Sequence, residues 1–162
     1  MGIELARETP EDWWEVEDLF DRCFAPGREA LSSYRLRDGI PPVPELCLVA
    51  RDELAVVAGA IRFWPVIIGD KAALLLGPVA VHPIHQGEGL GRLLIESALD
   101  RANEWDRAML VGDAPYYGKF GFRKLNDVRM PPPTNPERVL GRALTTGAWD
   151  DVSGDVKRWD GT

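Results

Sequence analysis

The chain has 162 residues and is poor in the features that mark several classes of protein. Its only two cysteines, Cys23 and Cys47, lie far apart and show no metal-ligand spacing. This argues against a zinc site or a disulfide and favours buried thiols in a reducing cytoplasm. No stretch approaches the roughly 20 apolar residues that span a bilayer, so we expect no membrane partner. A signal peptide is not expected either, because acidic residues crowd the N-terminus, at Glu4, Glu8, Glu11 and Asp12.

Basic charge is also scarce, and the net charge of the chain is −7. Nucleic-acid binding normally requires a basic surface, so we expect no nucleic-acid partner. An acidic surface would instead favour the approach of a cationic amine. The length and the hydrophobic content of 45% suit one globular domain over residues 1–162, with a polar tail that we expect to be mobile from about residue 149.

The most informative segment is the glycine-rich stretch at residues 86–92, Q-G-E-G-L-G-R. It follows an apolar, strand-like run and opens an amphipathic helix. At such a turn, unpaired backbone N–H groups and the helix dipole converge on one point and can hold a phosphate group. Glycine lets the backbone close on the phosphate oxygens. The stretch matches neither the G-x-G-x-x-G pattern of dinucleotide folds nor the G-x-x-x-x-G-K-[S/T] pattern of NTP-binding loops.

Read as Q-x-x-G-x-G, the stretch places Gln86, Gly89 and Gly91 at the defining positions. In this form it resembles the pyrophosphate-binding signature of the GNAT superfamily of acyl-CoA-dependent N-acetyltransferases.

The sequence on both sides supports this resemblance. Residues 72–81 are apolar except for one Gly-Pro pair, which suits a strand buried on both faces. Residues 108–112 read as a second short buried strand. Tyr117 then stands four residues before Gly121 of a Gly-Phe pair, as in the family's Y-x-x-x-G-F element. The resemblance is specific over the core motif, residues 74–122.

The resemblance implies an α/β (α+β) fold with a mixed, mostly antiparallel central sheet of 6–7 strands. Helices would cover both faces, and two strands would splay apart at the CoA site. The periodicity of the chain predicts strands at residues 3–7, 46–51, 55–66, 71–81, 108–112, 126–130 and 138–144, and helices at residues 10–24, 28–37 and from 90 onward.

Several local features refine these elements. Pro65 predicts an edge or an irregularity in its strand, and Gly77-Pro78 predicts a bulge or bend. Pro26-Gly27 is predicted to end the first helix, and Gly69-Asp70 to form a tight turn between two strands. Thr9 and Asp12 have the spacing of a capping box before the first helix. The helix that begins at residue 90 is predicted to bury one face, made of Leu90, Leu93, Leu94, Ser97, Ala98 and Ala102.

The resemblance also implies the donor site. Acetyl-CoA would be the co-substrate, and no metal would be needed. Backbone groups of residues 79–81, at the end of the strand before the glycine turn, would pair with the pantetheine arm as an added strand does. One N–H of the same residues would stabilise negative charge on the thioester oxygen. The turn would hold the pyrophosphate, with Gln86 or Arg92 adding side-chain contacts. The expected cofactor-binding residues are Val79, Ala80, Val81, Gln86, Gly87, Glu88, Gly89, Leu90, Gly91 and Arg92.

Tyr117 is the expected general acid. A phenol stays protonated at neutral pH and can donate to a departing thiolate. The alternative is that Tyr117 only packs. Tyr116 is the rival acid, because a one-residue slip rotates the hydroxyl by about 100° around a helix.

The general base stays open among His82, His85, Asp113 and Glu45. A structural role is favoured for His82 and a capping role for Asp113. Ordered water could equally take the proton of the amine.

The acceptor is expected to be an unidentified primary amine that attacks the thioester directly. By resemblance it would lie near residues 23–44 and 131–136, where Arg28, Arg35 and Arg37 could recognise an anionic group. Trp64 either lines a pocket or covers the sheet. A non-catalytic acyl-CoA sensor and a protein that retains only the fold are the alternatives. A homodimer is possible, as in many members of the family.

Overall fold

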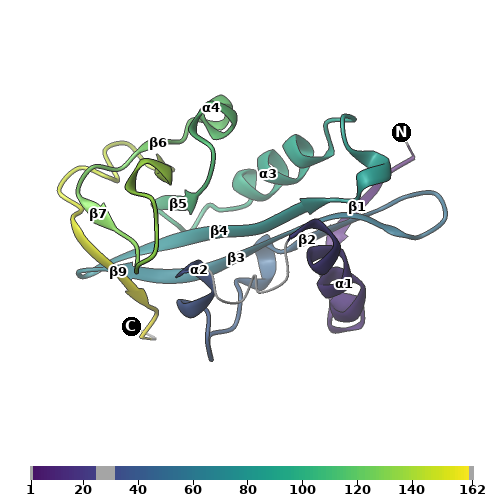
Figure 1. Ribbon diagram of the computed structural model, residues 1–162, viewed down its shortest axis with the longest axis horizontal. Helices are drawn as coiled ribbons and strands as arrows, with labels where there is room; N and C mark the ends of the chain where they lie inside the picture. Colours follow the sequence, from purple (N-terminus) through teal and green to yellow (C-terminus); the bar gives the residue numbers. More distant parts are fainter. Residues whose placement is uncertain (1, 25–31, 161–162) are drawn as a thin grey trace. The chain divides into compact units, whose positions relative to one another are not determined.

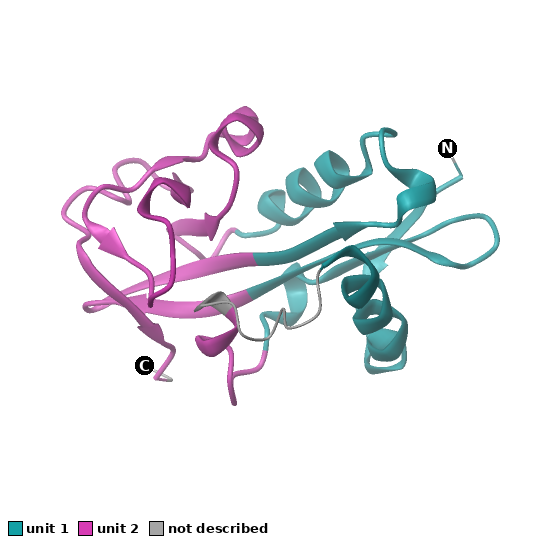
Figure 2. Ribbon diagram, viewed as in Figure 1, with its two compact units in different colours: residues 1–28, 42–63, 77–102 teal, residues 29–41, 64–76, 103–162 magenta. Residues whose placement is uncertain are grey.

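The computed structural model of the chain describes residues 2–24 and 32–160 (Figure 1). These residues fold into two compact units, each built from separate stretches of sequence (Figure 2). The first unit falls within residues 1–28, 42–63 and 77–102, and the second within residues 29–41, 64–76 and 103–162. The single domain expected from the sequence stays a prediction.

The strands of the first unit are all antiparallel to their neighbours. β1 (Glu4–Arg7) pairs with β2 (Leu48–Arg51), and β2 pairs with the first part of β3 (Val57–Ile68). The last part of β4 (Lys71–Val81) follows β3 in the strand order. β3 and β4 are joined by a turn at Gly69 and Asp70, as the sequence predicts.

Two helices cover opposite faces of these strands (Figure 2). α1 (Trp13–Cys23) follows the 3₁₀ turn η1 (Pro10–Asp12), and it packs its buried residues against a core that includes Ala60 of β3. α3 (Leu90–Asp100) lies on the other face, where a Cβ at Gly59 would come within 3.2 Å of Leu90. Neighbouring residues of a strand face opposite sides, so Gly59 and Ala60 mark the two layers.

The predicted start of the first helix is confirmed. The backbone N–H of Thr9 donates to Asp12 Oδ2 at 2.8 Å, and the Thr9 hydroxyl lies 3.1 Å from the same oxygen. The second predicted helix, residues 28–37, is α2 (Ser32–Arg35) in the structure. Residues 28–31 of that prediction, and the Pro26-Gly27 pair expected to end α1, lie outside the described residues.

The predicted buried face of α3 is partly wrong, because it includes one exposed residue and leaves out two buried ones. Leu93 is 39% exposed, whereas Ile95 and Leu99, which the prediction left out, are buried. Both sides of the helix carry apolar residues, so periodicity alone leaves two possible faces. The close approach of α3 to Gly59 selects the face with Leu94 and Ile95.

The second unit holds the remaining strands. β5 (Arg107–Val111) lies between β4 and β8 (Val139–Ala143), parallel to the first and antiparallel to the second. β8 also pairs with the short β6 (Arg123–Lys124). Among the described residues, the β4–β5 ladder joins only residues 74–75 to 108–109, as a pair of strands that splay apart would.

Two strands of the second unit were missed or misjudged from the sequence. β9 (Gly154–Arg158) lies in the tail that was expected to be mobile, and it pairs with β3 and with β7 (Val128–Arg129). β6 was not predicted. Nine strands therefore occur in the described residues, rather than 6–7, but the mixed, mostly antiparallel architecture is confirmed.

Prolines and glycines mark irregular points in the long strands. Pro65 lies in β3 between the residues that pair with β2 and those that pair with β9, so it interrupts neither of these two ladders. Gly77 has φ of 130° and is joined to Pro78 by a cis peptide bond, and β4 continues through both residues. No helix in residues 2–24 or 32–160 is long and apolar enough to span a membrane.

Candidate functional site

The glycine turn, residues 86–92, leads from β4 through the 3₁₀ turn η4 (Pro83–His85) into α3. Gly87 and Gly89 have φ values of 86° and 80°, in the left-handed region that favours glycine. A Cβ at either position would meet no heavy atom within 4 Å. Glycine is therefore needed here for backbone conformation, and open space lies above both residues.

The turn presents a row of unpaired donors. The first helical hydrogen bond runs from Leu93 N–H to the Gly89 carbonyl at 3.1 Å. In the part of the chain that the structure describes, the backbone N–H groups of residues 87–91 donate to no protein acceptor. Together with the positive end of the α3 dipole, these groups form a site suited to an anion.

The end of β4 exposes backbone groups beside this turn. His82 N–H donates to the Ala58 carbonyl of β3 at 2.8 Å. Because alternate residues of an antiparallel strand direct their backbone groups to opposite edges, those of Val79 and Val81 point away from β3. The Val81 carbonyl accepts hydrogen bonds from Gln86 Nε2 at 3.3 Å and from the Cys23 thiol at 3.4 Å. Gln86 thus ties the turn to the strand.

The charged side chains of the turn have partners within the chain. Arg92 Nε lies 2.7 Å from Glu96 on the exposed side of α3. Glu88 Oε1 lies 3.0 Å from His85 Nδ1, and the other ring nitrogen, Nε2, lies 3.2 Å from Asp52 between β2 and β3. These bonds to Glu88, first, and to Asp52 raise the pKa of His85 above its ordinary value of 6.5. The contact with Asp52 was not predicted, because Asp52 and His85 are 33 residues apart in the chain.

We expect NMR titration to show the His85 ring with a pKa above 6.5, because the imidazolium is held between two carboxylates. A raised pKa in the folded state stabilises the fold at pH values below the unfolded-state pKa, and this contribution disappears as the pH rises through the folded-state value. Glu88→Gln should lower the pKa of His85, and Glu96→Gln, whose carboxylate binds Arg92, should leave it unchanged. A His85 ring that titrates at or below 6.5 would contradict this geometry.

Tyr117 lies in the second unit, at the end of the short helix α4 (Ala114–Tyr117). Its ring packs on the backbone at Gly112, where a Cβ would be 2.5 Å from the ring, and against the Phe122 ring at a centroid distance of 6.2 Å. Burial raises the pKa of Tyr117 to about 12, so the phenol remains protonated throughout the neutral range. The ring of Tyr117 therefore packs within its own unit, while its hydroxyl stays protonated and can donate a hydrogen bond. Tyr116 is more exposed.

Three of the four candidate bases can be placed by their contacts. His82 Nδ1 accepts from the Ile84 N–H at 3.2 Å, and Asp113 Oδ2 accepts from the Tyr116 N–H at 3.3 Å. Both contacts are the local structural roles favoured from the sequence. His85 is held by Glu88 and Asp52. Glu45 is exposed in the middle of η3 (Pro44–Leu46), the 3₁₀ turn that precedes β2.

Three of the residues considered for the acceptor, Arg35, Arg37 and Trp64, lie in the second unit. Trp64 is buried in its core, with the Arg37 guanidinium 5.3 Å from the ring centroid. Arg37 is itself buried, and Arg35 donates to the Pro132 carbonyl at 3.1 Å. Of the two roles predicted for Trp64, lining a pocket or covering the sheet, the structure therefore shows the second. Arg28 lies outside the described residues.

Comparison with known proteins agrees with this fold and turn. A family model described as an acetyltransferase (GNAT) domain matches residues 44–124. The uncharacterized N-acetyltransferase YhbS of Escherichia coli K12 is 32% identical over 157 residues, covering 93% of this chain and 92% of that protein. The crystal structure of E. coli YhbS in complex with CoA has a TM-score of 0.84 and 28% identity, and covers 99% of this chain and 91% of the other.

A second structure, a GNAT family acetyltransferase of Brucella melitensis in complex with acetyl-CoA, has a TM-score of 0.71. It is 28% identical and covers 98% of this chain and 96% of its own. The glycine turn and the mixed sheet thus define an acyltransferase. The chain belongs to the GNAT family of N-acetyltransferases.

Proposed function

We propose that the protein transfers an acetyl group from acetyl-CoA to a primary amine by direct attack of the amine on the thioester. The observation that carries the proposal is the row of unpaired N–H groups at residues 87–91, next to the exposed backbone of β4. The complexes of the two similar proteins with CoA and acetyl-CoA support the choice of donor.

The glycine turn has the features that a pyrophosphate requires. The N–H groups supply several donors to one anion, and the space above Gly87 and Gly89 is open to phosphate oxygens. Glu88 would repel an anion at this place, but its carboxylate is engaged by His85. When His85 is protonated, its charge offsets that of Glu88. The side chain of Arg92 is 63% exposed beside the turn and can add a cation.

The backbone groups of Val79 and the N–H of Val81, which point away from β3, would hold the pantetheine arm as an edge strand holds an added strand. The Val81 carbonyl is already engaged by Gln86 and Cys23. An N–H of this segment would donate to the thioester oxygen as negative charge develops there. The amine nitrogen then bonds to the carbonyl carbon, the carbon–sulfur bond breaks, and the amine loses a proton to water.

Tyr117 is proposed as the donor to the departing sulfur. Its phenol is protonated because burial raises its pKa to about 12. A thiol has a pKa of about 8.5, so full transfer from an isolated phenol is uphill. Tyr117 would therefore act first by hydrogen bonding to the thiolate, and transfer would be completed as the amine gives up its proton.

The proposal is tested by incubating the protein with acetyl-CoA and a panel of primary amines. Release of free CoA thiol should depend on the amine, and mass spectrometry should find the acetylated amine. Binding of acetyl-CoA without transfer to any member of a chemically broad panel would contradict the transfer reaction and favour a binding module.

A further inference from the structure

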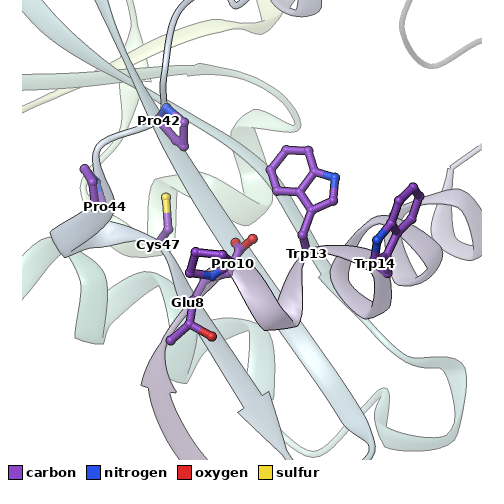
Figure 3. A pocket seen from close by; sticks show the side chains of 8 residues that line it. Glu8, Pro10, Trp13, Trp14, Pro42, Pro44 and Cys47 are labelled. Carbon is purple, nitrogen blue, oxygen red and sulfur yellow. The ribbon is translucent and has the colours of Figure 1, made fainter.

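A pocket with two tryptophans lies in the first unit, on the side of its strands that carries α1 (Figure 3). We call it the tryptophan pocket. It has a volume of about 470 Å³, within the range of small-molecule sites. Trp13 and Trp14 stand on one side of it, and Pro42, Pro44 and Cys47 on the other (Figure 3). Glu8, Thr9 and Pro10 complete the lining.

The apolar walls of the pocket are open to solvent. Trp14 is 81% exposed and Trp13 is 40% exposed, although large aromatic side chains usually gain most when they are buried. The lining comes from the two residues after β1, from η1 and α1, and from the segment before β2, so it is a built feature of the first unit and not one loop. An exposed aromatic wall around a cavity of this size indicates a ligand with an apolar body.

The position of the pocket along β3 relates it to the acetyl-CoA site. β3 and β4 are antiparallel, and Ala58 of β3 is level with His82, close to the glycine turn. The pocket lies further along β3, because the Cys47 thiol is 4.0 Å from the Phe63 carbonyl. A pantetheine arm that starts at the turn and follows β4 back toward Val79 runs in this same direction. Along the strand direction, the pocket is therefore displaced from the glycine turn in the same sense as a thioester bound along β4 would be, with β2 and β3 lying between β1 and β4.

The charges beside the pocket favour a cation. Glu8 Oε2 lies 2.8 Å from Arg62, and Arg62 also binds Glu17, so one buried guanidinium serves two carboxylates. Next to it, Arg51 binds both Asp12 and Glu15. These two groups contain four carboxylates and two guanidinium groups, so negative charge is in excess. The Cys47 thiol stays neutral, because burial raises its pKa to about 11.

We propose that the tryptophan pocket binds the acceptor, and that the acceptor is a primary amine carried on an aromatic or bulky aliphatic body. The apolar body would lie between the tryptophans and the prolines, with the ammonium group drawn to Glu8 and to the face of the Trp14 ring. A face of the Trp13 ring is already covered by the Arg62 guanidinium, 4.1 Å from its centroid. This inference rests on the proposed acetyl transfer. The family resemblance suggested residues 23–44 and 131–136; the pocket shares Pro42 and Pro44 with the first of these segments and adds the start of α1.

The first test compares three ligands. 2-Phenylethylamine combines an aromatic body with an amine, ethylamine lacks the body, and 2-phenylethanol lacks the charge. Calorimetric titration in the presence of CoA should rank 2-phenylethylamine at least about tenfold tighter than either of the others, since it alone has both contacts. Equal binding of all three, or no binding of 2-phenylethylamine, would overturn the proposal.

A pair of variants locates the binding site. Trp14→Ala removes an exposed wall of the pocket with little effect on folding, and it should weaken 2-phenylethylamine binding about 3- to 10-fold. Trp159→Ala is the matched control, because Trp159 packs on Trp105 in the second unit and does not line the pocket. Affinity for acetyl-CoA should be unchanged in both variants. Equal effects of the two substitutions on the amine would contradict the assignment.

The outcomes for the pocket and for the proposed function are separable. If amines are acetylated but the KM for 2-phenylethylamine is unchanged in Trp14→Ala, the pocket assignment is wrong and the acetyl transfer stands. If 2-phenylethylamine binds in the pocket but no amine is acetylated, the proposed function is wrong and the pocket is a ligand site of another kind.

Discussion

Tyr117→Phe is expected to lower kcat for acetyl transfer by about 100-fold while the KM for acetyl-CoA changes little. The substitution removes only the hydroxyl and keeps the ring, so the packing against Gly112 and Phe122 is retained. The departing thiolate would then have lost its hydrogen-bond donor. This loss is at the low end of the rate effect that general acids usually contribute, about 100- to 10,000-fold. A pKa of about 12 makes Tyr117 a weak acid toward a thiolate.

The control for this variant is Tyr116→Phe, which changes the neighbouring and more exposed tyrosine. It should retain kcat within about twofold. The pH profile of the wild-type enzyme should show no loss of activity from Tyr117 deprotonation below about pH 10, since its pKa is raised to about 12. A large loss in Tyr116→Phe and none in Tyr117→Phe would move the role to Tyr116.

The second large effect is on stability and comes from Arg62→Met. Arg62 is buried, and its guanidinium binds Glu8 through two bonds of 3.0 and 2.8 Å and also binds Glu17. Its planar group also lies 4.1 Å from the Trp13 ring centroid. Removing the cation leaves the nearly buried Glu8 without its partner, which costs about 3–5 kcal/mol in comparable cases.

Arg51→Met provides a matched control. Arg51 also binds two carboxylates, Asp12 and Glu15, but its side chain is 26% exposed rather than 3% for Arg62. Solvent screening should limit its cost to about 1 kcal/mol. Urea denaturation of both variants, with equal m values, measures the difference. Equal losses of unfolding free energy in the two variants would show that burial does not govern the strength of the Arg62 cluster.

The sequence predicted best what is determined locally. The glycine turn was recognised because the positive φ at Gly87 and Gly89 favours glycine, and glycine is visible in the sequence. The capping box at Thr9 and the turn at Gly69 are local in the same sense, and the structure confirms both. In each case a single short segment contains all the groups that interact.

Features that depend on distant residues were harder to predict. β9 is polar except for Val156, and it becomes a strand because β3 and β7 pair with it. The exposure of Leu93 was missed because the approach of α3 to the strands decides which apolar flank is buried. The contact of His85 with Asp52 joins two turns far apart in the chain.

The tryptophan pocket could not be predicted for the same reason. Its lining joins residues 8–14 to residues 42–47, and only the pairing of β1 with β2 brings these two segments together. Trp13 follows the same helical spacing as the buried residues Val16 and Phe20 of α1, yet it is 40% exposed. Helical periodicity identifies which residues share a face but does not reveal a cavity at the end of that face.

The central claim, that residues 86–92 bind the pyrophosphate of acetyl-CoA, is tested most directly by calorimetric titration of Gly89→Asp and Gly89→Asn with acetyl-CoA. Asp and Asn are of similar size, both tolerate a positive φ, and both are good helix N-cap residues, so only charge differs between the variants. We predict that Gly89→Asp binds acetyl-CoA at least about tenfold more weakly than Gly89→Asn, because a carboxylate would face the pyrophosphate. Equal affinities of the two variants would contradict the claim.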